Sequence, residues 1–222
     1  MNNIDQIKKL LSEPRKVAIT THQKPDADAM GSSLALKQYL EKKGHTVDVT
    51  VPTDYASFLN WMNGNNDVRI YTNENHSEVE KTFNDADIIF TLDFNALSRI
   101  NELGEIVRNS SAKKILIDHH QQPEGFEDIS YWDDKRAATA ELIFELINDL
   151  GDKHLIDAQI GECIYAGIMT DTGSFRFPST SKRVHEIIGD LIEAGVDNAK
   201  VHRLIYDTGS EDKLRFTGFA IS

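Results

Sequence analysis

Hydrophobic residues along the chain follow two patterns, one typical of buried strands and the other of helices with one apolar face. Short β-rich runs are found at Val17–Thr21, Thr46–Val51, Ile88–Leu92 and Ile115–Ile117. Nearly continuous apolar runs such as IIFTL are expected for parallel strands that helices cover on both faces. We therefore predict that these four segments are strands of a buried sheet.

Between and after these segments, apolar residues return every three or four positions, as on one face of a helix. The predicted helices are a first one with Ile4, Ile7, Leu10 and Leu11, closed by Pro14, and then Gly31–Lys43, Ala137–Leu150, Asp157–Met169 and Lys182–Ala194. The stretch between Val51 and Tyr71 has no clear pattern. Strands that alternate with helices predict an α/β fold: an open, mostly parallel, doubly wound sheet flanked by helices.

The last segment, Asn198–Ser222, also has a helical pattern. It ends with apolar residues for which no core is evident: Leu214, Phe216, Phe219 and Ile221. Two interpretations stay open. The segment is either a helix that folds back on the domain or a connector that leads towards a second domain.

Composition is that of a globular protein. Of the 222 residues, 40% are hydrophobic and 27% are charged, and the mean hydropathy is −0.41. No apolar run approaches the roughly 18 to 20 residues that cross a bilayer, and the first residues lack the apolar core of a signal peptide. The single cysteine, Cys163, excludes an internal disulfide and a multi-cysteine metal site. We therefore expect a cytoplasmic protein with no membrane partner.

The charge balance argues against binding to long nucleic acids. The chain has 24 basic and 36 acidic residues, which gives a net charge of −12 with neutral histidines. Phosphate repulsion would oppose binding through a broad surface of this charge. Small phosphate compounds remain compatible with it, provided that cations lie in the binding site.

Aspartate and histidine gather where the predicted strands end. In doubly wound sheets, ligands bind outside the carboxyl ends of the strands. The residues that follow a strand or end a helix are His22, Asp26 and Asp28, then Asp93, then Asp118, His119 and His120, and finally Asp171. Three strand ends and one helix end therefore contribute ionisable side chains to the same edge of the predicted sheet.

These residue types suit Mn²⁺ and, less selectively, Mg²⁺, Fe²⁺ or Zn²⁺. Two cations roughly 3.5 to 4 Å apart need a bridging carboxylate, and they can clamp the attacking and leaving oxygens of a phosphoryl displacement. Each element alone has a simpler explanation, because a D-x-D pair is more often a turn or a helix cap and an aspartate after a strand is often an N-cap. We interpret the combination as a metal site.

The same segments resemble a known family. HQKPDADAMGS, the isolated Asp93, IDHH and TDTGSFRFPST resemble the four motifs of the DHH phosphoesterase family. ATAELIFELI and GIMTDTGSFRF are similar to its bacterial nanoRNase branch, which comprises oligoribonucleases that also act as 3′-phosphoadenosine-5′-phosphate (pAp) phosphatases. Ala27 departs from the branch, which commonly has glycine there, but it is not a ligand position. The resemblance covers nearly the whole chain.

The resemblance implies a site with two Mn²⁺ ions. One ion would be held by His22 and Asp26 and the other by Asp28, His119 and Asp171, with Asp93 bridging both. His120 would contact the scissile phosphate and act as general acid. Asp118 would orient a neighbouring histidine or else bond the loop backbone, and both roles stay open.

Arg99, Ser32, Gly173 and Ser174 are weaker candidates for contacts with the substrate. Arg99 lies in the loop after the third predicted strand. Ser32 lies near the start of a predicted helix, where amides can face a phosphate, although helix capping is the more common use of serine. Gly173 and Ser174 either let the backbone approach the substrate or only form a turn. Cys163 has the helical spacing of a core residue rather than the setting of a nucleophile.

The function that the resemblance implies is a Mn²⁺-dependent phosphoesterase that hydrolyses short oligoribonucleotides or pAp to nucleoside monophosphates. Alternative substrates are linear products of cyclic dinucleotides, polyphosphate and pyrophosphate. A nucleotide-binding module without turnover is a further alternative, but the complete ligand set argues against it. Because relatives carry a C-terminal substrate-binding domain, we expect a DHH catalytic domain over residues 1–195 and, over 196–222, a helical connector towards a domain absent from this chain. A homodimer stays open.

Overall fold

The part of the chain that the computed structural model describes, residues 3–208 and 211–221, contains one six-stranded sheet. The strands are β1 (Lys16–Thr21), β2 (Thr46–Val51), β3 (Arg69–Ile70), β4 (Ile88–Leu92), β5 (Lys113–Asp118) and β6 (Ile129–Trp132). Their order is β3-β2-β1-β4-β5-β6, and every neighbouring pair is parallel. The predicted open, parallel sheet is confirmed.

Helices connect and follow the strands. They are α1 (Asn3–Leu10), α2 (Ala27–Lys42), α3 (His76–Asp85), α4 (Leu103–Asn109), α5 (Thr139–Asp149), α6 (Ala158–Asp171), α7 (Lys182–Glu193), α8 (Asn198–Tyr206) and α9 (Glu211–Ile221). Short 3₁₀ helices lie at Ser57–Leu59 (η1), Asn65–Asp67 (η2), Leu97–Ile100 (η3) and Lys153–Leu155 (η4). None of the described helices is both long and apolar enough to cross a membrane.

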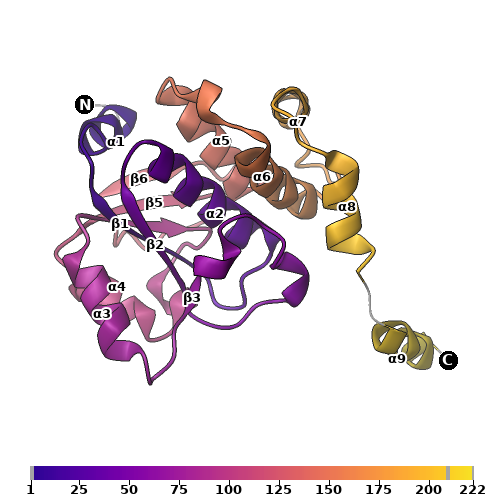
Figure 1. Cartoon of the computed structure of the whole chain (residues 1–222), viewed down its shortest axis with the longest axis horizontal. Coiled ribbons are helices and arrows are strands. Elements are labelled where there is room, and N and C mark those ends of the chain that lie inside the picture. Colours follow the sequence, from indigo (N-terminus) through magenta and orange to yellow (C-terminus); the bar gives the residue numbers. More distant parts are fainter. Residues whose placement is uncertain (1–2, 209–210, 222) are drawn as a thin grey trace.

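Alternate residues of the central strands face two separate hydrophobic layers. On β1, Val17 and Ile19 belong to the larger core, and Ala18 belongs to the smaller one. The larger core lies beneath α2, α5 and α6, and the smaller one beneath α3 and α4 on the opposite face of the sheet (Figure 1). α7 and α8 pack against α6. Coverage on both faces explains why the central strands are almost wholly apolar.

The centre of the sheet is the point where the direction of strand addition reverses. β1 and β4 are neighbours there. After β1 the chain adds β2 and β3 on one side, and after β4 it adds β5 and β6 on the other. Such a reversal leaves a crevice outside the carboxyl ends of the two central strands, where ligands bind. His22 follows β1 and Asp93 follows β4, so the fold brings both residues to this crevice.

Some element boundaries differ from the predictions. α2 begins at Ala27 rather than at Gly31, because the side chain of Asp26 caps the helix at that point. β3 and β6 were not predicted, since they are edge strands of only two and four residues. α3 and α4 were also missed, because both are short and polar on one side, and α3 buries only Val79 and Phe83.

The C-terminal segment forms two helices rather than one continuous pattern. α8 packs on the domain through Val201 and Ile205, which are both buried. On α9, Phe216, Phe219 and Ile221 are exposed, as expected for residues without a core to join. The side chain of Leu214 lies outside the described residues.

α2 and α6 approach each other closely behind the crevice. A side chain at Gly31 would collide with the carbonyl oxygen of Cys163, and a Cβ at Gly167 would lie 2.7 Å from Asp28 Oδ1. The two glycines therefore allow α6 to lie directly against the start of α2. Cys163 is fully buried at this contact, which confirms the prediction of a core residue, and burial raises the pKa of its thiol to about 12.

Candidate metal centre

Asp26 serves a helix and the crevice at the same time. Its Oδ1 accepts hydrogen bonds from the amides of Asp28 (2.9 Å) and Ala29 (3.0 Å) in the first turn of α2. Its other oxygen, Oδ2, lies 3.9 Å from His22 Nε2. Asp26 therefore caps α2 with one carboxylate oxygen and leaves the second one for a ligand.

Asp28 is fully buried and caps a different helix. Its Oδ2 accepts a hydrogen bond of 2.7 Å from the amide of Thr139, and its Oδ1 accepts one of 2.8 Å from the amide of Ala140. Both amides belong to the first turn of α5, whose positive end therefore points at the carboxylate. Asp28 Oδ2 also lies 3.8 Å from His119 Nε2. The N-terminus of α5 thus holds Asp28 in place at the crevice.

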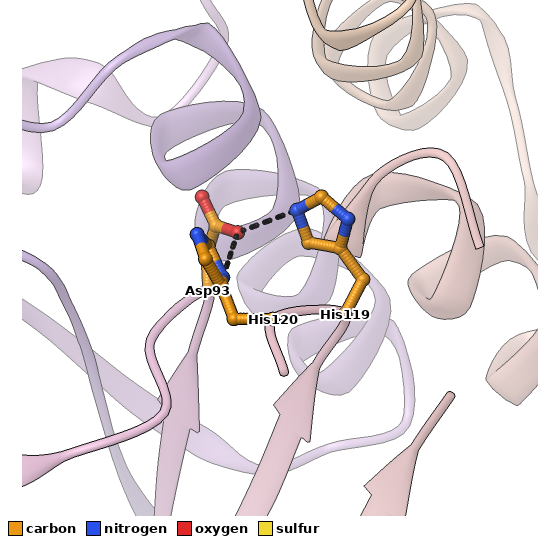
Figure 2. A group of neighbouring side chains, drawn as sticks. All are labelled: Asp93, His119 and His120. Atoms are coloured by element: carbon orange, nitrogen blue, oxygen red, sulfur yellow. Dashed lines mark ion pairs between the residues drawn. The ribbon is translucent and has the colours of Figure 1, made fainter. Parts of the chain in front are cut away.

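Asp93 lies between two histidines just after β4. Its Oδ2 is 3.4 Å from His22 Nε2, and its Oδ1 is 3.4 Å from His119 Nε2. The backbone of Asp93 has a φ of +64°, in the left-handed region where non-glycine residues are uncommon and strained. Figure 2 shows the carboxylate between His119 and His120. Because each of its oxygens faces a different histidine, Asp93 has the arrangement of a bridging ligand.

Backbone carbonyls orient two of these imidazoles. His22 Nδ1 lies 2.8 Å from the carbonyl oxygen of Gln23, and His119 Nδ1 lies 3.3 Å from that of Arg136. A carbonyl oxygen can only accept, so the proton must be on Nδ1 in both rings. The Nε2 atoms are then left towards the aspartates as ligand atoms, which is the usual arrangement of metal-binding histidine.

Within the described residues, three groups of side chains bring their ligand atoms within 4.8 Å of one another. They are His22, Asp26 and Asp93, then Asp28, His119 and Asp171, and finally Asp93, His119 and His120. Asp171 is the last residue of α6, and its Oδ2 lies 3.5 Å from His119 Nε2. The first two groups contain all six residues that the sequence resemblance implies as ligands.

Asp118 and His120 form a pair beside this cluster. Asp118 Oδ1 lies 2.8 Å from His120 Nδ1, and it also accepts a bond of 3.2 Å from the amide of the same residue. The two roles considered for Asp118, orienting a histidine and bonding the loop backbone, therefore occur together. The side chain of His120 is 34% exposed, so its Nε2 can reach a molecule in the crevice.

Burial and neighbouring charges shift the pKa values of the cluster. Burial raises the pKa of Asp28 well above its usual value, and the charges of Asp93 and Asp171 raise it further. Burial and the charge of Asp93 raise the pKa of Asp171 to about 7. Burial would also raise the pKa of Asp93, but hydrogen bonds from His119 and His22 outweigh it and lower the pKa. For His119, burial acts downwards, but the bond to Asp93 raises its pKa to about 9.

This donor set fits two divalent cations. Imidazole nitrogens and carboxylate oxygens are ligands of Mn²⁺ and related ions. Asp28 and Asp93 are almost fully buried, with exposed fractions of 0% and 2%, and buried like charges are costly unless cations or protons compensate them. The four aspartates of the two ligand sets carry four negative charges, which two divalent cations would balance.

Two of the weaker candidates lie in different surroundings. The carbonyl oxygen of Arg99 accepts a bond of 2.8 Å from the amide of Gln23, which connects η3 to the loop of His22. The guanidinium of Arg99 has no ion pair among the described residues. Ser32 is fully buried inside α2, and its hydroxyl donates to the carbonyl of Ala29. Arg99 therefore lies beside the crevice, whereas Ser32 does not reach it.

Gly173 and Ser174 belong to a turn that follows Asp171. The φ values of Gly173, Ser174 and Phe175 are +56°, +59° and +63°, three left-handed residues in succession. A Cβ at Gly173 would collide with the ring of Phe177. The Ser174 hydroxyl donates a bond of 3.1 Å to the phenol oxygen of Tyr206. In this structure both residues shape the turn.

Thr139 is a site residue that the sequence did not reveal. It is fully buried, and its hydroxyl donates a bond of 2.8 Å to Asp93 Oδ1. The sequence offers one signal, a threonine near the start of ATAELIFELI. This segment forms α5, which is more completely buried than α6. That position predicts helix capping, so the contact with Asp93 becomes visible only in the folded chain.

Comparisons with known proteins agree with this geometry. The profile of the DHH family, N-terminal domain, matches residues 16–168. The chain is 30% identical over 202 residues to the bifunctional oligoribonuclease and PAP phosphatase NrnA of Thermus thermophilus, and 26% identical over 197 residues to that of Bacillus subtilis. These matches cover 90% and 86% of this chain but only 56% and 57% of the relatives. The chain thus spans little more than half the length of these curated relatives.

Solved structures share the fold. An exopolyphosphatase-related protein from Bacteroides fragilis superposes with a TM-score of 0.96 at 39% identity, over 99% of this chain and 64% of that one. The exonuclease RecJ bound to manganese superposes with a TM-score of 0.52 at 17% identity, over 93% of this chain and 55% of that one, and shares the fold. Because the family profile covers more than half of the chain and the four motifs meet in one crevice, this protein belongs to the DHH family.

Proposed function

We propose that this chain hydrolyses phosphoester bonds in short oligoribonucleotides or in pAp, with two Mn²⁺ ions held in the crevice. The observation that carries the proposal is the position of Asp93, whose two oxygens lie 3.4 Å from His22 and 3.4 Å from His119. A carboxylate in this position can bridge two cations, as in enzymes that displace phosphoryl groups. The products would be nucleoside monophosphates.

The ligand sets follow from the two groups of side chains. His22 and Asp26 would hold one cation, Asp28, His119 and Asp171 the other, and Asp93 would bind both. When bound, the cations supply positive charge against the phosphate oxygens and the attacking and leaving oxygens. The chain itself contributes rigidity, because helix N-termini, backbone carbonyls and a buried threonine hold the ligands before any substrate arrives.

His120 would act as the general acid. Its Nδ1–H donates to Asp118 Oδ1 at 2.8 Å, so the proton for the leaving oxygen would be held at Nε2. The carboxylate of Asp118 is fully buried, and it would stabilise the imidazolium and fix the orientation of the ring. A histidine and an aspartate have the same division of roles in serine hydrolases. The transfer leaves His120 neutral, and a solvent proton restores it.

Arg99 would bind a phosphate oxygen of the substrate. Its guanidinium has no ion pair among the described residues, and its backbone is bonded to the loop that carries His22. In a chain with a net charge of −12, a cation without an ion-pair partner among the described residues would favour the approach of an anion. The fork of the guanidinium also matches two phosphate oxygens at once.

Nucleotide substrates are supported by the relatives named as oligoribonuclease and PAP phosphatase, at 30% and 26% identity. A second candidate is polyphosphate, because the Bacteroides fragilis protein with a TM-score of 0.96 is described as exopolyphosphatase-related. Both reactions use the same pair of cations. They differ in whether a nucleoside or a further phosphate group lies beside the cleaved bond.

The test is a hydrolysis assay with Mn²⁺ and four substrates: a diribonucleotide, pAp, polyphosphate and pyrophosphate. We expect nucleoside monophosphate from the first two substrates, and we expect Asp93→Asn to abolish release and weaken binding of both cations. Asp48→Asn is the matched control, because it makes the same chemical change at an exposed position of β2. Cleavage of polyphosphate alone would favour the second candidate, and no turnover of any substrate by a metal-loaded chain would overturn the proposal.

Further predictions accompany this function. A preference for small phosphate compounds over long nucleic acids agrees with the net charge of −12, and a cytoplasmic location remains a prediction. The division at residue 195 and the role of 196–222 as a connector remain predictions. A homodimer also remains a prediction, and sedimentation of the purified chain tests it.

A further inference from the structure

A cavity of about 420 Å³ opens beside the ligand cluster. Its lining includes two of the proposed ligands, Asp26 and Asp171, and two aromatic residues, Phe58 and Tyr206. The remaining lining residues are Ala27, Thr170 and Ile205. The cavity therefore connects carboxylates that would hold the cations with two aromatic rings. Both rings are accessible, with 38% of Phe58 and 51% of Tyr206 exposed.

The ring of Tyr206 is held in place from two sides. The hydroxyl of Ser174 donates to its phenol oxygen at 3.1 Å, and the imidazole of His202 lies beside it with a centroid distance of 6.0 Å. Val201 and Ile205 anchor α8 in the core. An aromatic side chain with few rotatable bonds and fixed neighbours loses little freedom when a ligand stacks on it.

The support for Tyr206 comes from the same segment that provides a ligand. Asp171 ends α6, and the left-handed residues Gly173, Ser174 and Phe175 follow after one intervening residue. Strained backbone of this kind is found where the surrounding structure requires a particular position. Here it brings the Ser174 hydroxyl to Tyr206 and places the Phe175 ring 5.7 Å from that of Tyr165. The turn therefore links the proposed ligand Asp171 to the ring of Tyr206.

The charges of the cavity select among occupants. The charged residues that line it are Asp26 and Asp171, and no lysine or arginine is among the described lining residues to bind a second phosphate group. An uncharged aromatic base needs no such partner, and every nucleobase can stack on an aromatic side chain. A phosphate at the cations would carry its nucleoside into the adjoining space. The size and the wall chemistry thus fit a nucleobase rather than a chain of phosphates.

We propose that this cavity is the base-binding subsite, in which Tyr206 and Phe58 stack on the base of the nucleotide whose phosphate lies at the cations. This inference rests on the proposed function only in so far as the cluster binds a phosphate group. It assigns Ser174 the part of a positioning residue, which acts through Tyr206. The occupant is a nucleobase, and the subsite tolerates all four bases because stacking does not read base edges.

The test compares two ligands that differ only in the base. Adenosine 5′-monophosphate and ribose 5-phosphate are titrated by calorimetry into the Mn²⁺-loaded chain. We expect the nucleotide to bind about 5- to 100-fold more tightly, which corresponds to the usual strength of base stacking on an aromatic ring. Tyr206→Ala should remove most of this difference and leave the affinity for ribose 5-phosphate unchanged. Phe58→Ala should have the same effect.

Two control variants separate stacking from structure. Tyr206→Phe keeps the ring and loses only the bond with Ser174, so it should retain most of the preference for the nucleotide. Phe216→Ala removes an aromatic ring that is 73% exposed on α9, away from the cavity lining, and should change neither affinity. Equal binding of both ligands by the unaltered chain would overturn the subsite, as would an equal loss of both in Tyr206→Ala and Phe58→Ala.

Binding and turnover give separate answers. The titration needs no hydrolysis, so base-dependent binding by a chain that cleaves no oligonucleotide would overturn the proposed function and keep the subsite. Hydrolysis of the diribonucleotide without any base-dependent affinity would overturn the subsite and keep the proposed function. If a polypeptide segment occupied the cavity instead, the two small ligands would bind equally in the titration.

Discussion

The hydroxyl of Thr139 donates a hydrogen bond of 2.8 Å to Asp93 Oδ1. The backbone amide of the same threonine donates to Asp28 Oδ2 at 2.7 Å. One residue at the start of α5 thus orients a carboxylate that follows β4 and another at the start of α2. Asp28 and Asp93 lie far apart in the sequence, and the start of α5 holds their carboxylates together in the cluster.

Replacing Thr139 by valine should weaken metal binding without unfolding the chain. Thr139→Val keeps the shape and the backbone amide, and it removes only the donor to Asp93. Loss of such an outer partner typically costs about 10- to 100-fold in metal affinity or activity. Calorimetric titration with Mn²⁺ measures the effect, and Thr139→Ser should restore most of the affinity. Equal affinities in the valine variant and the unaltered chain would show that the hydroxyl does not position Asp93.

Asp28→Ala should destabilise the fold even in the presence of a chelator. Two buried amides at the start of α5, those of Thr139 and Ala140, would lose their acceptors, which costs about 1 to 3 kcal/mol. The raised pKa of Asp28 acts in the opposite direction at neutral pH, because the folded chain must then keep a costly buried charge or take up a proton. The comparison is therefore made with metal-free protein near pH 4, where this cost is small and the loss of the caps decides the result. Urea unfolding with EDTA measures the change. Asp28→Asn keeps one acceptor oxygen and should lose less stability, whereas equal stability of both variants and the unaltered chain would contradict the capping role.

His119 and His120 should differ in what their replacement removes. His119→Ala should lose metal as well as rate, because its Nε2 faces three carboxylates. His120→Ala should retain both cations and lose about 10²- to 10⁴-fold in kcat, the usual contribution of a general acid. Asp118→Asn should cause a smaller loss of rate and also leave the metal content intact. Metal analysis of each purified variant, beside its kcat, decides; loss of the same metal in both histidine variants would refute the separation of roles.

Metal affinity should rise with pH. Without cations, the pKa of Asp171 is about 7 and that of His119 is about 9, so both groups hold a proton at pH 6.5 and His119 still holds one at pH 8. A cation must displace these protons. The association constant should therefore rise with pH between pH 7 and 9, and more steeply below pH 7, where Asp171 also holds a proton. Calorimetry in buffers of different protonation enthalpy counts the protons released, and a flat profile would contradict the shifts.

Arg99→Ala should raise KM more than it lowers kcat, because its proposed contact is with a phosphate of the bound substrate. A hydrogen bond with a charged partner accounts for roughly a 10- to 100-fold change. Lys81→Ala is the control, since it removes an exposed cation from α3 that belongs to none of the groups of ligand atoms. An unchanged KM in Arg99→Ala would remove this residue from the substrate site.

Much of the fold could be predicted because the central strands are buried on both faces. β2 matches its predicted range, Thr46–Val51, and β4 matches Ile88–Leu92. The one charged residue in these two runs, Asp48, is exposed and does not interrupt the buried face. The edge strand β3 could not be predicted in this way, because its two residues, Arg69 and Ile70, remain partly exposed. Short elements at the periphery are decided by tertiary contacts that leave little pattern in the sequence.

The cluster itself followed from the rule that ligands bind at the carboxyl ends of strands. What the sequence could not decide was whether Asp26 and Asp28 are helix caps or metal ligands, because it presents these as alternatives. In the structure one oxygen of Asp26 caps α2 and the other faces His22, so the cap leaves an oxygen available for the proposed ligand role. The hydroxyl of Thr139 was missed for a related reason: its partner, Asp93, lies 46 positions away.

Asp26 and Asp28 cap helices and also face the crevice. This affects how catalytic and non-catalytic sequences with this fold can be told apart. A descendant that had given up catalysis would still need both aspartates, because α2 and α5 would otherwise lose their caps. His22 and His119 cap no helix. Besides the carboxylates, they bond the backbone carbonyls of Gln23 and Arg136 among the described residues. Mutational drift in an inactive lineage should therefore erase the histidines first. The presence of both histidines should distinguish active enzymes from inactive proteins of the same fold better than the presence of the aspartates does.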